Sequence, residues 1–211
     1  KSEQNKVWAG MARETAHQIG TPLSSLMGWA ALLQEKEGNE DIVIEMNKDI
    51  LRLQTIAERF SKIGSQPELQ SEDINKVVQR SFYYMKDRSS SKIDFQLEPS
   101  SEKVSARINY QLFGWVLENI MRNSIDSLSG MGEIKLLVSV QGKRVYIDIS
   151  DTGKGIKSTE LKMVFEPGFT TKHRGWGLGL SLVKRIVEDY HKGQVFILKS
   201  ELGKGTTFRI S

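Results

Sequence analysis

The chain has 211 residues, of which 38% are hydrophobic and 27% are charged, and it contains no cysteine. This balance is that of a folded globular protein, and the lack of cysteine excludes disulfides, cysteine metal sites and thiol catalysis. Because acidic and basic residues alternate around a net charge of only +4, we expect no nucleic-acid partner. No apolar run approaches the ~20 residues of a membrane helix, and no signal peptide is visible. We therefore expect a cytoplasmic segment that does not itself insert into a membrane.

Residues 2–63 carry the rhythm of two helices. Apolar side chains recur mostly in steps of three and four, in two series: Val7, Met11, Ile19, Leu23, Leu26, Ala30 and Leu33, then Ile42, Met46, Ile50, Leu53, Ile56 or Ala57, Phe60 and Ile63. The polar break between them predicts an antiparallel helical hairpin. Because a hairpin cannot enclose both stripes, we expect two copies to form a four-helix bundle, and hence a homodimer. The alternative is packing against the second half of the same chain.

The pattern changes after Gly64, where Gly and Pro break the helix and residues up to Glu72 read as a linker. Helices are predicted at 75–86, 110–128 (with Asn109 as N-cap) and 178–190. Strands are predicted at 92–98, 133–140, 144–150, 194–200 and 206–210, with a hairpin turn around Gly142. Helices mixed with antiparallel strands predict an α/β sandwich in which helices cover one face of the sheet. The whole chain is thus an α+β protein with two domains.

Two motifs in this second part suggest ligand binding. Asn119 and Asn123 lie four residues apart on a predicted helix, so both amides leave from one face. Amide oxygens suit a hard cation such as Mg²⁺, although polar surface is the simpler explanation. Asp151 follows a strand and precedes Gly153 and Gly155. Its carboxylate could accept a hydrogen bond from an exocyclic amine while the glycines let the backbone approach a ligand, or the segment could be only a tight turn.

Further motifs follow in the chain. Gly175, Gly177 and Gly179, with Leu178 among them, open a helix whose backbone N–H groups could attract phosphate. Residues 157–174 are long enough to form a lid, from which Lys172 could reach a γ-phosphate. Thr206, in a glycine-rich turn between two strands, could place a hydroxyl near a nucleotide base.

The order Asn119…Asn123, DTGKGI, FEPGFTTK, GWGLGL and GKGTTF resembles the N, G1, F, G2 and G3 boxes of histidine kinases. These kinases belong to the ATPase superfamily shared with gyrase, Hsp90 and MutL. The resemblance implies a Bergerat-type ATP-binding fold with Asp151 on adenine. It also implies Mg²⁺ on Asn123 and Asn119, phosphates at the glycines of residues 175–179, and Lys172 neutralising phosphate charge.

The first helix contains AHQIGTPLSSL, which resembles the H-box of dimeric histidine kinases. His17 lies about 200° around the helix from the apolar stripe and so faces solvent. The resemblance makes His17 the phosphoryl acceptor, and Thr21 a residue that orients water for dephosphorylating a partner. Gln18 replaces the acidic residue usual in the family, which should slow transfer rather than forbid it. Gln18 is either natural to this branch, as the divergent Gly20 suggests, or an engineered change.

These inferences predict a dimerisation and phosphoacceptor domain at residues 1–64, a linker at 65–72 and a catalytic ATP-binding domain at 73–211. The predicted function is ATP-dependent autophosphorylation of His17, followed by transfer to an aspartate on the receiver domain of a response regulator. One alternative is a pseudokinase that binds ATP and scaffolds a regulator. Another is an ATPase of the gyrase type, which we discount because Asn119 stands where that group has a glutamate base.

Overall fold

The computed structural model describes residues 19, 23–24, 26–34, 40–63, 67–172 and 177–211. The chain divides into two compact units, Lys1–Pro67 and Glu68–Ser211. Along the described part of the chain, no helix combines the length and the apolar character needed to cross a membrane.

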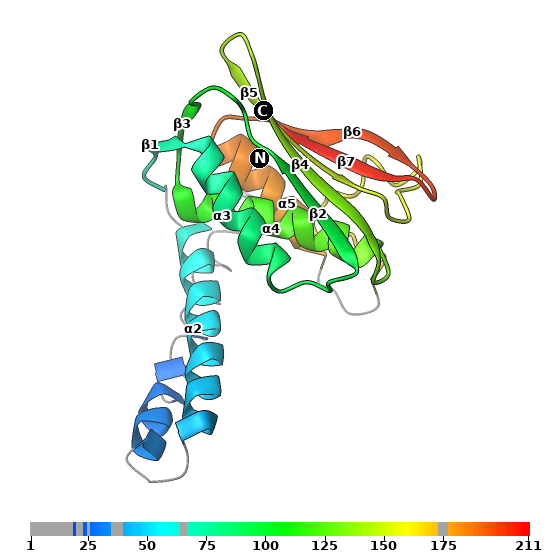
Figure 1. Cartoon of the computed structure of the whole chain (residues 1–211). Helices are drawn as coiled ribbons and strands as arrows, with labels where there is room; N and C mark the ends of the chain where they lie inside the picture. Colours follow the sequence, from blue (N-terminus) through cyan, green and yellow to red (C-terminus); the bar gives the residue numbers. More distant parts are fainter. Residues whose placement is uncertain (1–18, 20–22, 25, 35–39, 64–66, 173–176) are drawn as a thin grey trace. The chain divides into compact units, whose positions relative to one another are not determined.

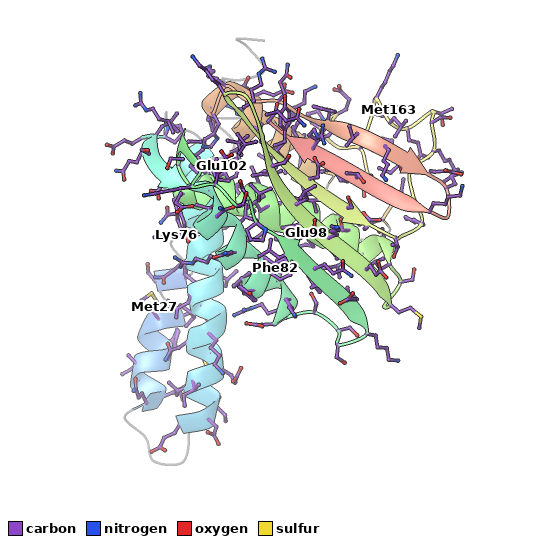
Figure 2. The ribbon with its side chains drawn as sticks, turned by 45° about the horizontal axis from the view of Figure 1, so that its top comes forward. Met27, Lys76, Phe82, Glu98, Glu102 and Met163 are labelled. Carbon is purple, nitrogen blue, oxygen red and sulfur yellow. The ribbon has the colours of Figure 1, made fainter. Side chains whose placement is uncertain are left out.

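The first unit contains two packed helical segments. Residues 23–24 and 26–34 are helical, and they pack against α2 (Glu40–Ile63). Leu23, Ala30 and Ile50 are buried together, and Met46 packs at their edge. Met27, labelled in Figure 2, accepts a hydrogen bond on its sulfur from Gln54 Nε2 at 3.0 Å. Other large apolar side chains remain exposed in this unit: Leu26, Trp29, Leu32, Ile42, Ile44, Leu51 and Leu53.

The second unit is a helical layer on one face of a five-stranded sheet (Figure 1). The helical elements are α3 (Ile74–Lys86), α4 (Tyr110–Ser127) and α5 (Gly179–Arg185), which continues as a π-helical turn, η1 (Ile186–Tyr190). The sheet has the order β2-β4-β5-β7-β6, with bounds Ile93–Glu98, Gly132–Gln141, Arg144–Asp151, Gly205–Ile210 and Val195–Glu201. Only β2 and β4 pair in parallel. This arrangement confirms the predicted α/β sandwich.

Helix α4 is the centre of the hydrophobic core. Asn109 begins it as predicted, because the Asn109 side chain accepts a hydrogen bond from Leu112 N at 3.1 Å. The helix lies between α3 and α5 (Figure 1). Its buried residues are Leu112, Phe113, Val116, Leu117, Ile120, Met121 and Ser124. A helix buried on two sides offers little freedom to shift, so polar side chains on its remaining face are held firmly in place.

The sheet follows the alternation of its sequence. On β4, Ile134, Leu136 and Val138 point into the core, whereas the intervening residues are more exposed. Phe82 of α3, labelled in Figure 2, meets Phe95 of β2 edge to face, with ring centroids 5.7 Å apart.

The face of the sheet away from the helices is polar. There Lys135 pairs with Glu98 at 2.6 Å, and Arg209 donates two hydrogen bonds of 2.7 Å to Asp148. These hydrogen bonds raise the pKa of the Arg209 guanidinium.

Two short strands and the end of the last helix differ from the expectations. Residues 70–72, predicted as linker, belong to β1 (Gln70–Asp73), which pairs with β3 (Ser105–Ile108) in a separate two-stranded sheet. Both strands have only four residues, too few for alternation to reveal them. The helix predicted at 178–190 changes to π-helical geometry at Ile186.

Candidate nucleotide-binding site

A cleft of about 660 Å³ opens between α4, the end of β5, the segment after it and the start of α5. Asn119, Asn123, Asp151, Lys172 and Thr206 all line it. The other predicted residues on its wall are Gly155, Gly177, Leu178 and Gly179. The fold thus brings together motifs that are as much as 87 residues apart in the sequence.

Asp151 stands at the buried end of the cleft, at the last position of β5. Its side chain is only 6% exposed. One carboxylate oxygen, Oδ1, accepts hydrogen bonds from Gly153 N at 2.9 Å and from Ser127 Oγ at 3.0 Å. Within the part of the chain that the structure describes, Oδ2 has no hydrogen-bond partner. Oδ2 is not among the fully enclosed polar atoms of the described residues and Asp151 lines the cleft, so Oδ2 can accept a hydrogen bond from a ligand that brings an N–H group.

The glycines after Asp151 serve close packing of the chain. A Cβ on Gly153 would lie 1.9 Å from Ser127 Oγ, and Gly153 is not part of the cleft wall. Gly155 has φ +72°, and a Cβ there would lie 2.2 Å from the carbonyl oxygen of Glu201. Of the two, only Gly155 faces the cleft, so Gly153 acts by letting the turn close onto α4.

The two asparagines of α4 face the cleft with different partners. Asn119 donates from Nδ2 to the carbonyl oxygen of Trp115 at 2.9 Å, which turns its Oδ1 toward Gly179. A Cβ on Gly179 would come within 3.3 Å of that oxygen. Asn123 accepts a hydrogen bond on Oδ1 from Lys172 Nζ at 2.8 Å. Asn119 Oδ1 is thus directed toward the start of α5, and Asn123 Oδ1 toward Lys172.

Gly177, just before α5, packs closely against the turn at Gly168. It has φ +64°, and a Cβ on it would lie 2.4 Å from the carbonyl carbon of Gly168. Gly168 N donates to Gly177 O at 3.0 Å. Helix α5 begins after Leu178, whose side chain makes no capping hydrogen bond. Only glycine fits at position 177, because both the backbone conformation and the space forbid a side chain.

Thr206 closes the cleft opposite Asp151, with which it pairs across β5 and β7. The Thr206 hydroxyl lies 2.9 Å from Ser200 Oγ. Ser200 Oγ in turn accepts a hydrogen bond from Ile156 N at 2.9 Å. This chain of hydrogen bonds joins β7, β6 and the segment that follows Asp151.

Comparisons with known proteins identify this arrangement. Residues 109–211 match the family of histidine kinase-, DNA gyrase B- and HSP90-like ATPases. The chain is 31% identical over 207 residues to the sensor histidine kinase ZraS of Escherichia coli K12, covering 95% of this chain and 44% of ZraS. The catalytic domain of histidine kinase ThkA is 26% identical, with a TM-score of 0.62 over 68% of this chain and 94% of that domain.

The chain belongs to the sensor histidine kinases. The second unit of the kinase therefore carries an ATP-binding domain of this superfamily. A structure of ThkA in complex with the response regulator TrrA has the same fold. The match covers 99% of the present chain and 62% of the matched chain, with 21% identity and a TM-score of 0.64. The kinase chain spans less than half the length of the curated relatives that it matches.

Four predicted residues of the kinase lie outside the described residues: His17, Gln18, Thr21 and Gly175. Two site residues were missed, Ser127 and Asp126. Ser127 Oγ donates a hydrogen bond to the Asp151 carboxylate. Asp126 pairs with Lys172 at 2.5 Å. Helical spacing could have found Asp126, because residues 119, 123 and 126 follow an i, i+4, i+7 series on one face.

The side-chain oxygens of Asn123 and Asp126 are chemically suited to Mg²⁺. The described residues contain no cluster of three or more His, Cys, Asp or Glu that could enclose a metal ion by itself. Mg²⁺ is commonly held by one or two protein oxygens, with phosphates and water completing the shell. The ammonium group of Lys172 stands between Asn123 Oδ1 and Asp126 Oδ2, so a cation already occupies the position that these oxygens favour.

Proposed function

We propose that this kinase chain uses ATP to phosphorylate His17 and then passes the phosphoryl group to an aspartate on the receiver domain of a response regulator. The observation that carries the proposal is the free Oδ2 of buried Asp151 in a cleft that also presents Asn119, Asn123 and Lys172. This set offers an acceptor for the exocyclic amine of adenine at one end. At the other end it offers oxygens for a cation and a positive charge for phosphates.

In the proposed reaction the kinase mainly aligns groups and neutralises charge. Asp151 orients the base, the backbone around Gly177 and Gly179 receives the phosphates, and Lys172 balances their charge. Mg²⁺ held by Asn123 and Asn119 would neutralise the phosphates further. As the bond between His17 Nε2 and the γ-phosphorus forms, the bond to the bridging oxygen breaks and ADP leaves with the electron pair. The oxygen of Gln18 can hold the ring proton on Nδ1, and that proton then passes to solvent.

Homodimer formation is part of the proposal. The exposed apolar side chains of the first unit, among them Trp29 at 61% and Leu51 at 61% exposure, are more than a single pair of helices can cover. Pairing with a second copy as a four-helix bundle would bury them. Thr21 is proposed to orient water in the reverse reaction, removal of phosphate from the regulator.

Incubation with γ-labelled ATP and Mg²⁺ tests the autokinase. We expect label that is lost in acid, survives in base and is absent from a His17→Ala variant, because phosphohistidine behaves in this way. Label that persists in the variant would place the phosphoryl group elsewhere.

The second candidate is an ATP-binding pseudokinase, which Gln18 favours because it replaces the usual carboxylate. It predicts that the chain binds ATP yet takes up no label. A Gln18→Glu variant distinguishes the two explanations for such a result: restored label would indicate a damped kinase, and continued absence of label would indicate a pseudokinase.

A further inference from the structure

The Lys172 ammonium group lies between two oxygens of α4 within the cleft. It donates to Asn123 Oδ1 at 2.8 Å and to Asp126 Oδ2 at 2.5 Å. Both members of the ion pair are partly exposed, Lys172 at 40% and Asp126 at 45%. The contact joins the lid segment to the central helix across 46 residues of sequence, so it is a tertiary feature rather than a local surface pair.

The position of Lys172 is set by short turns in the lid segment. Its own backbone N–H donates to Thr170 Oγ1 at 3.1 Å. Phe169 N donates to Glu166 O at 3.2 Å, and Gly168 N to Gly177 O at 3.0 Å. On the other side, Asn123 and Asp126 belong to one turn of a buried helix. The Asn123 and Asp126 oxygens are therefore held on a packed helix. Lys172 reaches them from a loop through a long side chain with several rotatable bonds, so the ammonium group is the one that can move.

We propose that Asp126 makes nucleotide binding dependent on the metal ion, and that the Lys172 ammonium group is the resident cation that Mg²⁺ replaces. This inference rests on the proposed function. A triphosphate without metal would meet the Asp126 carboxylate as a like charge, and it could recruit Lys172 only by leaving Asp126 unbalanced. Mg²⁺ held by Asn123 and Asn119 would stand beside the Asp126 carboxylate and offset its charge, so the ammonium group would be repelled from Asn123 Oδ1 and become available to the phosphates.

Two consequences follow, of which the first concerns the metal enhancement, defined as the dissociation constant of the nucleotide in EDTA divided by that in Mg²⁺. Asp126→Asn removes the repulsion, so metal-free nucleotide binds more tightly and the enhancement falls. Lys172→Met leaves Asp126 without its balancing charge and also removes the positive charge that the phosphates receive in Mg²⁺. The nucleotide therefore binds more weakly in both conditions.

The experiment is a calorimetric titration of the complete 211-residue chain with a non-hydrolysable ATP analogue, in Mg²⁺ and in EDTA. We expect the enhancement to fall about fivefold in Asp126→Asn, since one unit charge at ~4 Å in a solvated site is worth a factor of that order. Lys172→Met should weaken nucleotide binding in Mg²⁺ and in EDTA alike. Glu160→Gln and Lys157→Met make the same charge changes elsewhere on the cleft wall and should leave the enhancement unchanged.

Each outcome decides a different point. An enhancement that Asp126→Asn leaves at the wild-type value, with nucleotide binding intact, overturns this inference alone. Equal shifts in the two control variants would reduce the effect to general cleft charge and overturn it as well. A wild-type chain that binds no nucleotide in Mg²⁺ overturns the proposed function, and this inference with it. Circular dichroism of each variant separates loss of folding from loss of binding.

Discussion

At the scale of single residues, Asp151 has two separate tasks, one for each carboxylate oxygen. Oδ1 holds the turn by accepting from Gly153 N and Ser127 Oγ. In the proposed function, Oδ2 accepts a hydrogen bond from the nucleotide. This division allows the two tasks to be separated by substitution, because an asparagine can keep the Oδ1 contacts while presenting N–H donors to the cleft.

Asp151→Asn should therefore weaken ATP binding without unfolding the domain. The acceptor for the exocyclic amine becomes a donor, and losing a hydrogen bond to a charged group costs about 2 kcal/mol, or roughly thirtyfold in affinity. Titration calorimetry with an ATP analogue in Mg²⁺ measures the loss. Ser127→Ala, which removes only one supporting bond, should have a smaller effect. Unchanged ATP affinity in Asp151→Asn would mean that the base is bound elsewhere.

At the scale of elements, the π-helical end of α5 is joined to the start of α4 by His191. Its Nε2 accepts a hydrogen bond from Asn109 N at 2.9 Å, so Nδ1 is the donor to Ile186 O at 2.8 Å. Burial is the main cause that lowers the pKa of His191 below the usual 6.5, while the hydrogen bond to the carbonyl oxygen of Ile186 acts in the opposite sense. Protonating Nε2 would set an N–H against the N–H of Asn109, the residue that caps α4.

This contact predicts how stability depends on pH. Since the folded state holds His191 neutral below the pKa of the unfolded chain, acidification from pH 7 through 6.5 protonates the unfolded state first and lowers stability. The loss ends once the pH passes the lower, folded-state pKa. Thermal denaturation at several pH values should show a wild-type Tm that falls more steeply than that of His191→Gln, by a few degrees at most. Parallel Tm curves would contradict this prediction.

At the scale of the whole molecule, the chain consists of a helical unit with exposed apolar side chains and an ATP-binding unit with a closed core. The second unit buries its apolar residues in one continuous cluster around α4. Among its described residues, the first unit buries Leu23, Ala30 and Ile50 together, whereas Trp29 and Leu51 are exposed. Exposed apolar side chains on paired helices favour a partner surface.

Leu51→Glu should therefore weaken the proposed homodimer. Leu51 is 61% exposed on α2, and a carboxylate placed in an apolar bundle interface would be strongly disfavoured. Light scattering after size exclusion should show the molar mass falling toward that of one chain. Leu202→Glu makes the same change at a leucine that is 59% exposed in the other unit, and it should leave the mass unaltered. A wild-type chain that is already monomeric would exclude the bundle.

The sequence by itself determined the features that depend on neighbours along the chain. Alternation placed β4 and β5, Asn109 marked the start of α4, and helical spacing directed Asn119 and Asn123 to one face. The order of the glycine-rich motifs identified the ATP-binding domain, because each motif is local.

Only the tertiary structure decided which distant groups meet. Four-residue strands such as β1 and β3 carry too little pattern to be recognised, and they form because each supplies hydrogen bonds to the other. Gly153 is required by Ser127, which lies on another element. Helical spacing puts Asp126 on the same face as Asn119 and Asn123, but only the fold brings Lys172 to it. Periodicity reports the face on which a side chain lies, whereas its partner across the fold is set by how the elements pack.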